Sequence, residues 1–247
     1  MGNILLREDK DGLCTLTLNR PEKHNALNTE LFRRLDQEFA RLEGQADTIG
    51  CVVLRANGKS FCAGADLVAA RDETRPPPLT FKPGVIERMA NLPQIVVAAV
   101  HSTCVTGGLE LALGADLIVA SHSARFADTH GKWGYVAGWG MIQRLPRRIG
   151  MGQAKLMMTT GRYVGAEEAH RIGLVDMLVA DEGLSDTVAA LARDILANSW
   201  HSNRGTKKLM IDTEGMRLAD GLAHEYLRYP GVAPDFKERV AQFGKKD

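Results

Sequence analysis

The 247 residues include 31 basic and 30 acidic side chains, and a net charge of +1 gives no overall field that would recruit nucleic acid or an anionic membrane. A hydrophobic content of 45% and a charged content of 25% are typical of a globular protein. The longest apolar stretch, Ile95–Val100, is too short to span a bilayer. We therefore expect one large core and neither a nucleic-acid nor a membrane partner.

The cysteines and histidines show no spacing typical of a metal site. Cys14, Cys51, Cys62 and Cys104 lack a C-x-x-C pair, which predicts free, mostly buried thiols in a reducing compartment and a cytoplasmic protein. Five histidines are interpreted as structural or solvated, and no metal ligand is expected among them: His101, His122, His170, His201 and His224.

The first part of the chain alternates predicted strands and helices. Asp11-Gly12 is a hairpin turn between strands at 4–6 and 13–18, and Asn28 can cap a helix over 29–42. Further along we expect strands at 51–54, 95–100 and 117–120, helices at 84–91 and 107–114, a short extended piece at 125–127 and a surface loop around the proline run 76–78. This alternation favours parallel βαβ units in an α/β fold.

After about residue 140 the pattern becomes mainly helical. Helices are expected at 141–149, 152–160, 166–172 and 184–198, with one strand at 175–179. We therefore expect an α/β core over residues 1–195 and a helical C-terminal appendage over residues 196–247.

Two segments place small residues where an apolar run turns into a helix. They are Gly58-Lys59-Ser60-Phe61-Cys62-Ala63-Gly64-Ala65-Asp66-Leu67 and Thr106-Gly107-Gly108-Leu109-Glu110. Backbone N–H groups at such turns lack an intrahelical partner and can bind developing negative charge. Two facing turns would form an oxyanion hole beside Glu110, which indicates chemistry on a carbonyl compound. Either turn by itself is typical of an ordinary tight connection between a strand and a helix.

Glu110 lies within the apolar run Leu109-Glu110-Leu111-Ala112-Leu113. A carboxylate is costly to bury without partners, so a raised pKa and a role in proton transfer are expected. The alternative is a glutamate neutralised by the helix N-terminus and nearby amides.

Five segments in a fixed order resemble those of a known family. They are residues 19–28 (NRPEKHNALN), 61–67 (FCAGADL), 107–112 (GGLELA), 115–120 (ADLIVA) and 161–175 (GRYVGAEEAHRIGLV). Together they resemble the crotonase, or enoyl-CoA hydratase/isomerase, superfamily. The resemblance implies a spiral of repeated ββα units, a C-terminal region that makes the contacts of a homotrimer or dimer of trimers, and an acyl-CoA substrate. It implies no metal or redox cofactor, since coenzyme A is part of the substrate.

The resemblance also implies roles for individual residues. The amides of Ala65 and Gly107 would hold the thioester oxygen, and Glu110 matches the first of two catalytic glutamates. Contacts to substrate and coenzyme A are implied for Lys23, His24, Ala26, Ala63, Asp66, Leu67 and Gly108. Lys23 is also explained as an exposed loop lysine, and Asp66 as a helix cap.

The sequence departs from the family at the second glutamate. Where the family has Phe-Gly-x-Pro-Glu, this chain has Phe126-Ala127-Asp128-Thr129-His130. A neutral imidazole can accept a proton near pH 7, so His130 can serve as the second group, with Asp128 orienting or replacing it. A structural or surface histidine is the alternative.

The leading interpretation is an enoyl-CoA hydratase-like enzyme. A CoA-thioester isomerase, hydrolase or decarboxylase needs only one acid/base and an oxyanion hole, and a catalytically impaired acyl-CoA binder is the remaining alternative. Three aromatic side chains are candidates for an acyl-pocket wall, or for the core or an interface: Trp133, Tyr135 and Trp139.

Overall fold

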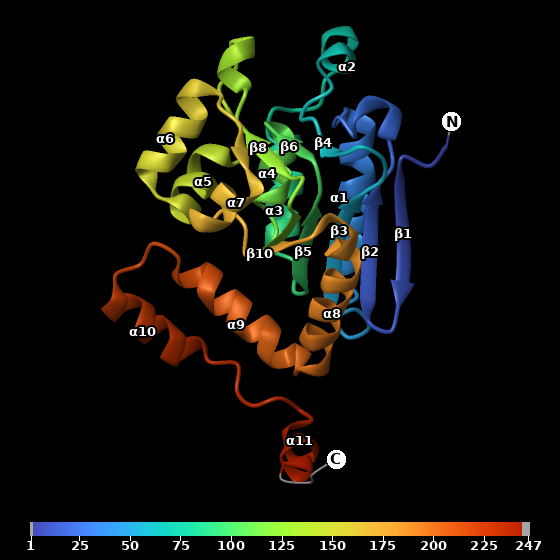
Figure 1. Cartoon of the computed structure of the whole chain (residues 1–247). Coiled ribbons are helices and arrows are strands. Elements are labelled where there is room, and N and C mark those ends of the chain that lie inside the picture. Colours follow the sequence, from blue (N-terminus) through green and yellow to red (C-terminus); the bar gives the residue numbers. More distant parts are fainter. Residues whose placement is uncertain (1, 244–247) are drawn as a thin grey trace.

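The computed structural model describes residues 2–243 and contains two β-sheets (Figure 1). The larger sheet has the order β1 (Leu5–Lys10), β2 (Leu13–Leu18), β3 (Cys51–Ala56), β5 (Ile95–Val100), β7 (Leu117–Ser121), β10 (Met177–Val179). The smaller sheet has the order β4 (Ser60–Cys62), β6 (Thr103–Val105), β8 (Arg125–Ala127), β9 (Val164–Gly165). Neighbouring strands are parallel except at β1–β2 and β8–β9.

The chain repeats one unit as it moves across both sheets. A strand of the larger sheet is followed by a strand of the smaller sheet and then by helix: β3, β4 and α2 (Leu67–Asp72) with α3 (Phe81–Ala90), then β5, β6 and α4 (Gly107–Ala112). The strands β7 and β8 begin the next unit and lead to the short 3-10 helix η2 (His130–Trp133). The predicted α/β spiral of ββα units is confirmed.

Local sequence signals account for the first elements. Asp11 and Gly12 both have positive φ, at 49° and 83°, as the tight hairpin between β1 and β2 requires. Asn28 caps α1 (Thr29–Glu43), because its side-chain oxygen accepts a hydrogen bond of 2.9 Å from the amide of Leu31. The predicted hairpin and cap are both confirmed.

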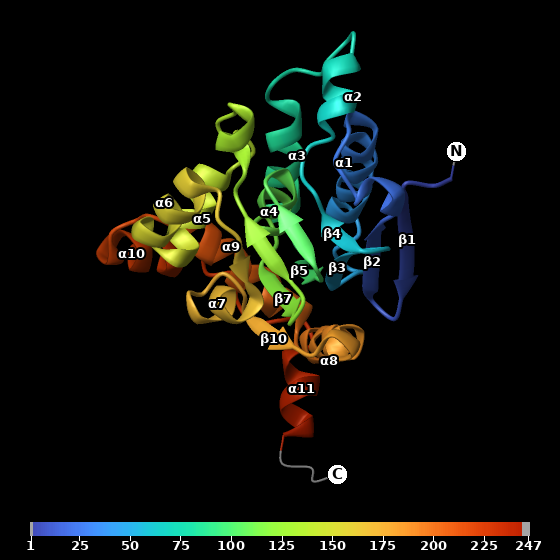
Figure 2. The same ribbon diagram turned by 45° about the horizontal axis from the view of Figure 1, so that its top comes forward.

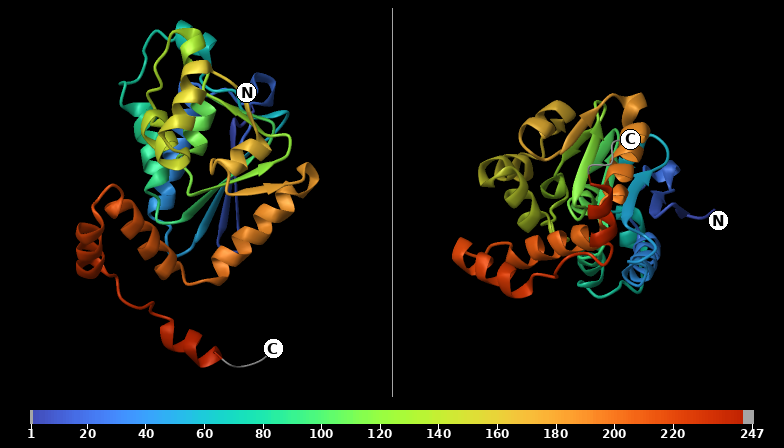
Figure 3. Two further views of the ribbon diagram at one scale, coloured as in Figure 1. Left: turned by 60° about the vertical axis from the view of Figure 1, so that its left-hand side comes forward. Right: turned by 90° about the horizontal axis from the view of Figure 1, so that it is seen from below.

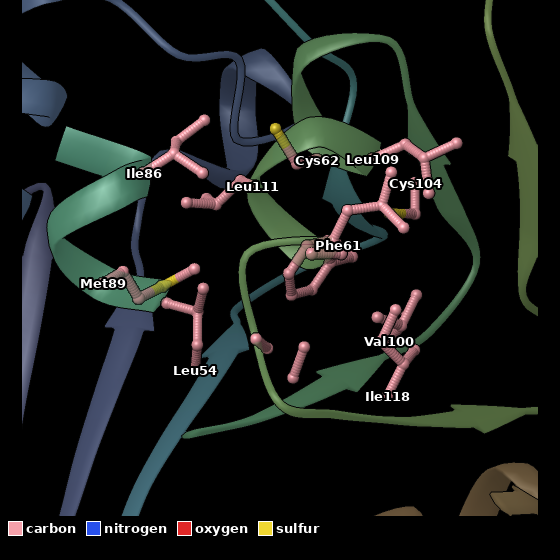
Figure 4. Packing of buried hydrophobic residues seen from close by; sticks show 14 of the residues in the cluster. Leu54, Phe61, Cys62, Ile86, Met89, Val100, Cys104, Leu109, Leu111 and Ile118 are labelled. Atoms are coloured by element: carbon pink, nitrogen blue, oxygen red, sulfur yellow. The ribbon is translucent and has the colours of Figure 1, made fainter. Parts of the chain in front are cut away.

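The two faces of the larger sheet pack against different helices (Figure 2). Alternate residues of the parallel strands point to opposite faces. One face packs with α1, α3 and α4 in the main core, where Phe61, Leu109, Leu111, Ile86 and Met89 lie close together (Figure 4). The other face packs against Val188 and Ala192 of α8 (Leu184–Ala197). The strands are therefore buried on both sides, as expected for a parallel sheet.

The second half is mainly helical, as predicted. Its elements are α5 (Met141–Ile149), α6 (Met151–Thr160), α7 (Ala166–Arg171), α8, α9 (Trp200–Thr213), α10 (Leu218–Arg228) and α11 (Phe236–Gln242), and the remaining 3-10 helices are η1 (Pro21–Lys23) and η3 (Asp181–Gly183). Helices α10 and α11 lie farther from the sheets than α9 does (Figure 3). Residues 244–247 of the predicted appendage and residue 1 of the predicted core lie outside the described residues.

Of the smaller sheet, the sequence predicted β8, as the extended piece at 125–127, but not β4, β6 or β9. These strands have two or three residues, which is too short for an alternation to be visible. Helix α3 begins at Phe81, three residues earlier than predicted, because Pro83 falls in its first turn, where a missing N–H costs no hydrogen bond.

All four cysteines are free and buried, as predicted. Over the part of the chain that the structure describes, the helices are too short or too polar to cross a bilayer.

A buried ion pair fastens α9 to the larger sheet. Lys207 donates to the carboxylate of Asp116 at 2.7 Å and to the carbonyl of Gln94 at 2.9 Å. The same Asp116 oxygen accepts a 2.7 Å hydrogen bond from the amide of Val96, at the start of β5. Burial lowers the pKa of Lys207 and raises the pKa of Asp116, while their mutual attraction opposes both shifts. Each charge therefore depends on the other to remain ionised.

We expect Lys207→Met to lower the free energy of unfolding by about 3 kcal/mol, because Asp116 is left as an uncompensated charge. This is at the lower end for such pairs, because the Asp116 side chain is 23% exposed. Denaturant titration at one protein concentration measures the effect. The double variant Lys207→Met with Asp116→Asn should recover part of the loss, and a double variant no more stable than Lys207→Met contradicts this explanation.

Candidate active site

The amide of Ala65 points away from its neighbouring strand. Gly64 accepts a 2.7 Å hydrogen bond from the amide of Leu27, and the amide of Asp66 donates at 3.0 Å to the carbonyl of Leu27. Since alternate amides of an extended segment face opposite sides, the Ala65 N–H faces the other way. Within residues 2–243 it donates no hydrogen bond.

Gly107 begins α4 and lies next to that amide. A Cβ atom at Gly107 would lie 3.3 Å from the nitrogen of Ala65 and 2.5 Å from Cζ3 of Trp139. The preceding Thr106 has φ 50° and ψ −120°, an unfavourable conformation for a β-branched residue, and is held by a 2.9 Å hydrogen bond from its amide to the carbonyl of Ala127. The structure therefore brings the two predicted turns together and allows only a hydrogen atom on Gly107.

Glu110 lies one turn into α4 and is 1% exposed. Its Oε1 accepts hydrogen bonds from the amide of Trp139 at 2.7 Å and from that of Met141 at 3.3 Å, where α5 begins. Its Oε2 is buried and has no hydrogen-bond partner among the described residues. Amides thus neutralise one oxygen, as the alternative interpretation required, but leave the other free.

Burial raises the pKa of Glu110 above its ordinary value. The two amides and His130 lower it in part, and Asp128 raises it further. Burial outweighs the hydrogen bonds because only one of the two oxygens receives them.

The free oxygen of Glu110 faces His130. The Nε2 atom of His130 lies 3.6 Å from Oε2, and its Nδ1 lies 2.6 Å from Oδ1 of Asp128. The same Asp128 oxygen accepts a 3.0 Å hydrogen bond from the backbone amide of His130, so the ring is held in one orientation. Donation from Nδ1 to Asp128 leaves the Nε2 lone pair directed toward Glu110. His130 is thus no surface histidine.

Burial lowers the pKa of His130, but the hydrogen bond and charge of Asp128, with the charge of Glu110, outweigh it and raise the pKa overall. The pKa values of Glu110 and His130 are both raised, so the two groups titrate together and share a proton between Oε2 and Nε2.

Most of the residues predicted to contact coenzyme A lie on two segments, 23–26 and 63–67, that are joined by a 3.0 Å hydrogen bond from the amide of Ala63 to the carbonyl of His24. Lys23 and His24 are exposed, and Nδ1 of His24 lies 3.1 Å from Oγ of Ser60. Ala63 and Ala26 are partly buried, and Leu67 is exposed at the start of α2. Asp66 caps α2 by accepting from the amide of Ala69 at 3.0 Å and pairs with Arg20 at 3.0 Å.

Gly108 has a packing role that the sequence did not reveal. A Cβ atom there would lie 2.6 Å from the carbonyl oxygen of Cys62. Its small size therefore lets α4 pack directly on β4.

The three candidate aromatic residues occupy different environments. Trp133 and Tyr135 are 63% and 59% exposed, whereas Trp139 is partly buried against Gly107 and meets the ring of Phe32 edge-on at 5.0 Å. Trp139 contacts Gly107 and, through its amide, Glu110, whereas the amide of Tyr135 donates to the carbonyl of His130 at 3.1 Å. The sequence missed its amide as a partner of Glu110, although Gly138-Trp139-Gly140 before a helix marks a close backbone approach.

The chain is similar to known proteins over most of its length. The family model for enoyl-CoA hydratase/isomerase matches residues 8–242. A 1,2-epoxyphenylacetyl-CoA isomerase of Escherichia coli is 34% identical, with 98% of this chain and 96% of the relative covered. A short-chain-enoyl-CoA hydratase of Clostridium acetobutylicum is 33% identical, with 81% and 77% covered.

The fold also matches that of a solved structure. The crystal structure of an enoyl-CoA hydratase from Bacillus anthracis superposes with a TM-score of 0.92 at 29% sequence identity, covering 98% of this chain and 96% of the other. The chain therefore belongs to the enoyl-CoA hydratase/isomerase family of the crotonase superfamily.

Proposed function

We propose that the chain is an enoyl-CoA hydratase-like enzyme, which adds water to an unsaturated acyl-CoA thioester through an enolate. The observation that carries this proposal is the buried, unpartnered Oε2 of Glu110, which lies 3.6 Å from Nε2 of His130. A buried carboxylate oxygen without a donor costs stability and is explained by a proton that it exchanges with substrate.

The amides of Ala65 and Gly107 would bind the thioester oxygen. Their nitrogen atoms belong to adjacent turns, and the Ala65 amide is free to donate within the described chain. Donors fixed in advance stabilise an enolate oxygen more than a neutral carbonyl oxygen, which lowers the barrier. The flanking residues 23, 24, 26, 63, 66, 67 and 108 remain our candidates for contacts with the coenzyme.

Glu110 and His130 could bind one water molecule beside their contact. Two atoms 3.6 Å apart can each lie about 2.8 Å from the same water oxygen. In the proposed step His130 takes a proton from water, the hydroxide oxygen bonds to Cβ, and the π electrons move to the thioester oxygen. Protonated Glu110 then delivers its proton to Cα. Transfer of the proton from His130 to Glu110 restores both groups, and the cycle needs neither a metal nor a redox cofactor.

Isomerisation of the double bond is the second candidate. It uses the same enolate, with a proton removed from one carbon and returned to another, and the contact between Glu110 and His130 can relay that proton. One relative of this chain is named as an isomerase. A non-catalytic acyl-CoA binder is less well supported, because binding alone gives the free oxygen of Glu110 no task.

We also propose that α10, α11 and the segments around them associate with other copies of the chain, as a trimer or dimer of trimers. Apolar residues of this region are largely exposed, which is typical of a protein–protein contact. They are Leu218, Leu222, Tyr226, Leu227, Tyr229, Val232, Phe236, Val240 and Phe243.

We expect Glu110→Gln to lower turnover of the best substrate about 10²- to 10⁴-fold, because the amide keeps the acceptor for Trp139 but cannot exchange the proton. A panel of acyl-CoA thioesters incubated in ¹⁸O-labelled water and followed by mass spectrometry identifies the reaction: hydration adds one labelled oxygen, isomerisation adds none, and hydrolysis frees coenzyme A. Glu167→Gln, at an exposed glutamate, is the matched control. Unchanged turnover in Glu110→Gln contradicts the proposal.

The same variant also tests the raised pKa. The wild type loses stability relative to Glu110→Gln as the pH rises from the ordinary value of 4.5 through the raised pKa, since the unfolded carboxyl ionises first. Melting temperatures measured from about pH 5 to about pH 8 should therefore show a growing advantage for the variant. A variant that melts below the wild type at high pH would mean that the amides stabilise the charged form.

We expect Gly107→Ala to reduce kcat about 10²- to 10³-fold, because the added methyl group collides with Trp139 and crowds the Ala65 amide. Gly152→Ala, on the exposed side of α6 with no atom within 4 Å of the new Cβ, should retain full activity. Steady-state kinetics of both variants measure the two kcat values. Equal activity of the two contradicts the assignment of these amides.

We expect His130→Ala to lose about 10²- to 10⁴-fold in kcat. Asp128→Asn should reduce kcat less than His130→Ala does. It should also move the acidic limb of the kcat/KM profile to lower pH, because the carboxylate that raises the pKa of His130 is gone. A pH profile that does not move would show that Asp128 is only a structural partner of His130.

A further inference from the structure

Lys82 on α3 is a partly buried cation without an acidic partner. Its Nζ lies 5.6 Å from the ring centroid of Trp139 and 6.0 Å from that of Phe32. Across the described residues Lys82 makes no hydrogen bond and no ion pair within 4.0 Å, whereas Arg20 is paired with Asp66 and Lys207 with Asp116.

The two aromatic contacts do not satisfy the ammonium group. Both distances lie near the outer limit of about 6 Å for a cation–π interaction, and a ring face accepts no conventional hydrogen bond. A methionine would fill the same space without charge. The ammonium group of Lys82 therefore has no anion in contact with it among the described residues and is available to an anionic ligand.

Lys82 lies close to the thioester position of the proposed function. The ring of Trp139 contacts both Lys82 and Gly107, and the Trp139 amide binds Glu110. Lys82 and Ala65 also line the same cavity, of about 270 Å³. An acyl group that extends from the Ala65 amide into this cavity would therefore come near the amine.

The cavity is lined by three acidic and two basic side chains, and two of the acids are already paired with arginines outside the lining. Of its acidic residues, Asp66 is paired with Arg20 and Glu30 with Arg34. Glu73 accepts a 2.9 Å hydrogen bond from the hydroxyl of Thr29. Arg33 and Lys82 line the same cavity, and both are without an ion-pair partner among the described residues.

We propose that Lys82 binds a carboxylate carried by the acyl group, so that the site favours acyl-CoA thioesters with an anionic acyl tail. This rests on the proposed function. A phosphate of coenzyme A is the other possible anion. We favour the acyl carboxylate because the whole pantetheine arm separates the phosphates from the thioester, whereas Lys82 is one indole ring from Gly107.

The test is calorimetric titration of the full-length protein with saturated thioesters, which cannot be hydrated. Glutaryl-CoA is compared with pentanoyl-CoA, and adipoyl-CoA with hexanoyl-CoA, so that each pair differs in the terminal carboxylate. We expect the better carboxylated ligand to bind about 10-fold more tightly than its neutral partner. Lys82→Met should reduce that ratio to about one, and Lys82→Arg should keep most of it.

Lys155→Met, on the exposed side of α6, removes the same charge away from the cavity and should keep the wild-type ratio. Equal affinity of wild-type protein for carboxylated and neutral ligands overturns the proposal. The proposal also fails if Lys82→Met weakens the binding of free coenzyme A as much as it weakens the binding of the carboxylated thioesters. That result would assign the amine to a phosphate. If none of the thioesters binds, the proposed function fails as well, so the two failures are distinguishable.

Discussion

The arrangement of the candidate active site depends on the environment of one carboxylate oxygen, Oε2 of Glu110. Oε1 of Glu110 is bound by two backbone amides, while Oε2 is fully buried without a donor and faces His130. Leaving it unpaired costs free energy, which the large apolar core around α4 offsets. The arrangement leaves this oxygen without a donor from the fold while keeping its position fixed. A stable fold by itself has no need of it.

The surrounding backbone provides the rest of the arrangement. Gly64 has φ +95° and no room for a side chain beside Thr106, and Thr106 itself has an unfavourable positive φ. These conformations turn β4 and β6 so that the Ala65 and Gly107 amides meet. Side chains then add the acid/base pair, with Asp128 fixing the ring of His130. Strain is thus concentrated where the proposed chemistry takes place, and the sheets and α1 carry the stability.

Much of this could be predicted from the sequence, because small residues after an apolar run and a lone glutamate among leucines are local signals. The cap at Asn28 and the parallel strands of the larger sheet were equally visible. What was missed depends on long-range contacts. The Trp139 amide reaches Glu110 across 29 positions, and the three-residue strands β4 and β6 are defined by pairing with each other and, for β6, with β8. The isolation of Lys82 likewise follows from how α3 packs against α1, which no local pattern predicts.

The most direct test of the central claim is a crystal structure of the protein with an unreactive acyl-CoA thioester. Our account predicts the thioester oxygen within hydrogen-bond distance of both the Ala65 and Gly107 amides, with Oε2 of Glu110 and Nε2 of His130 on the same side of the acyl carbons. A thioester bound elsewhere, or one whose oxygen meets neither amide, would contradict it.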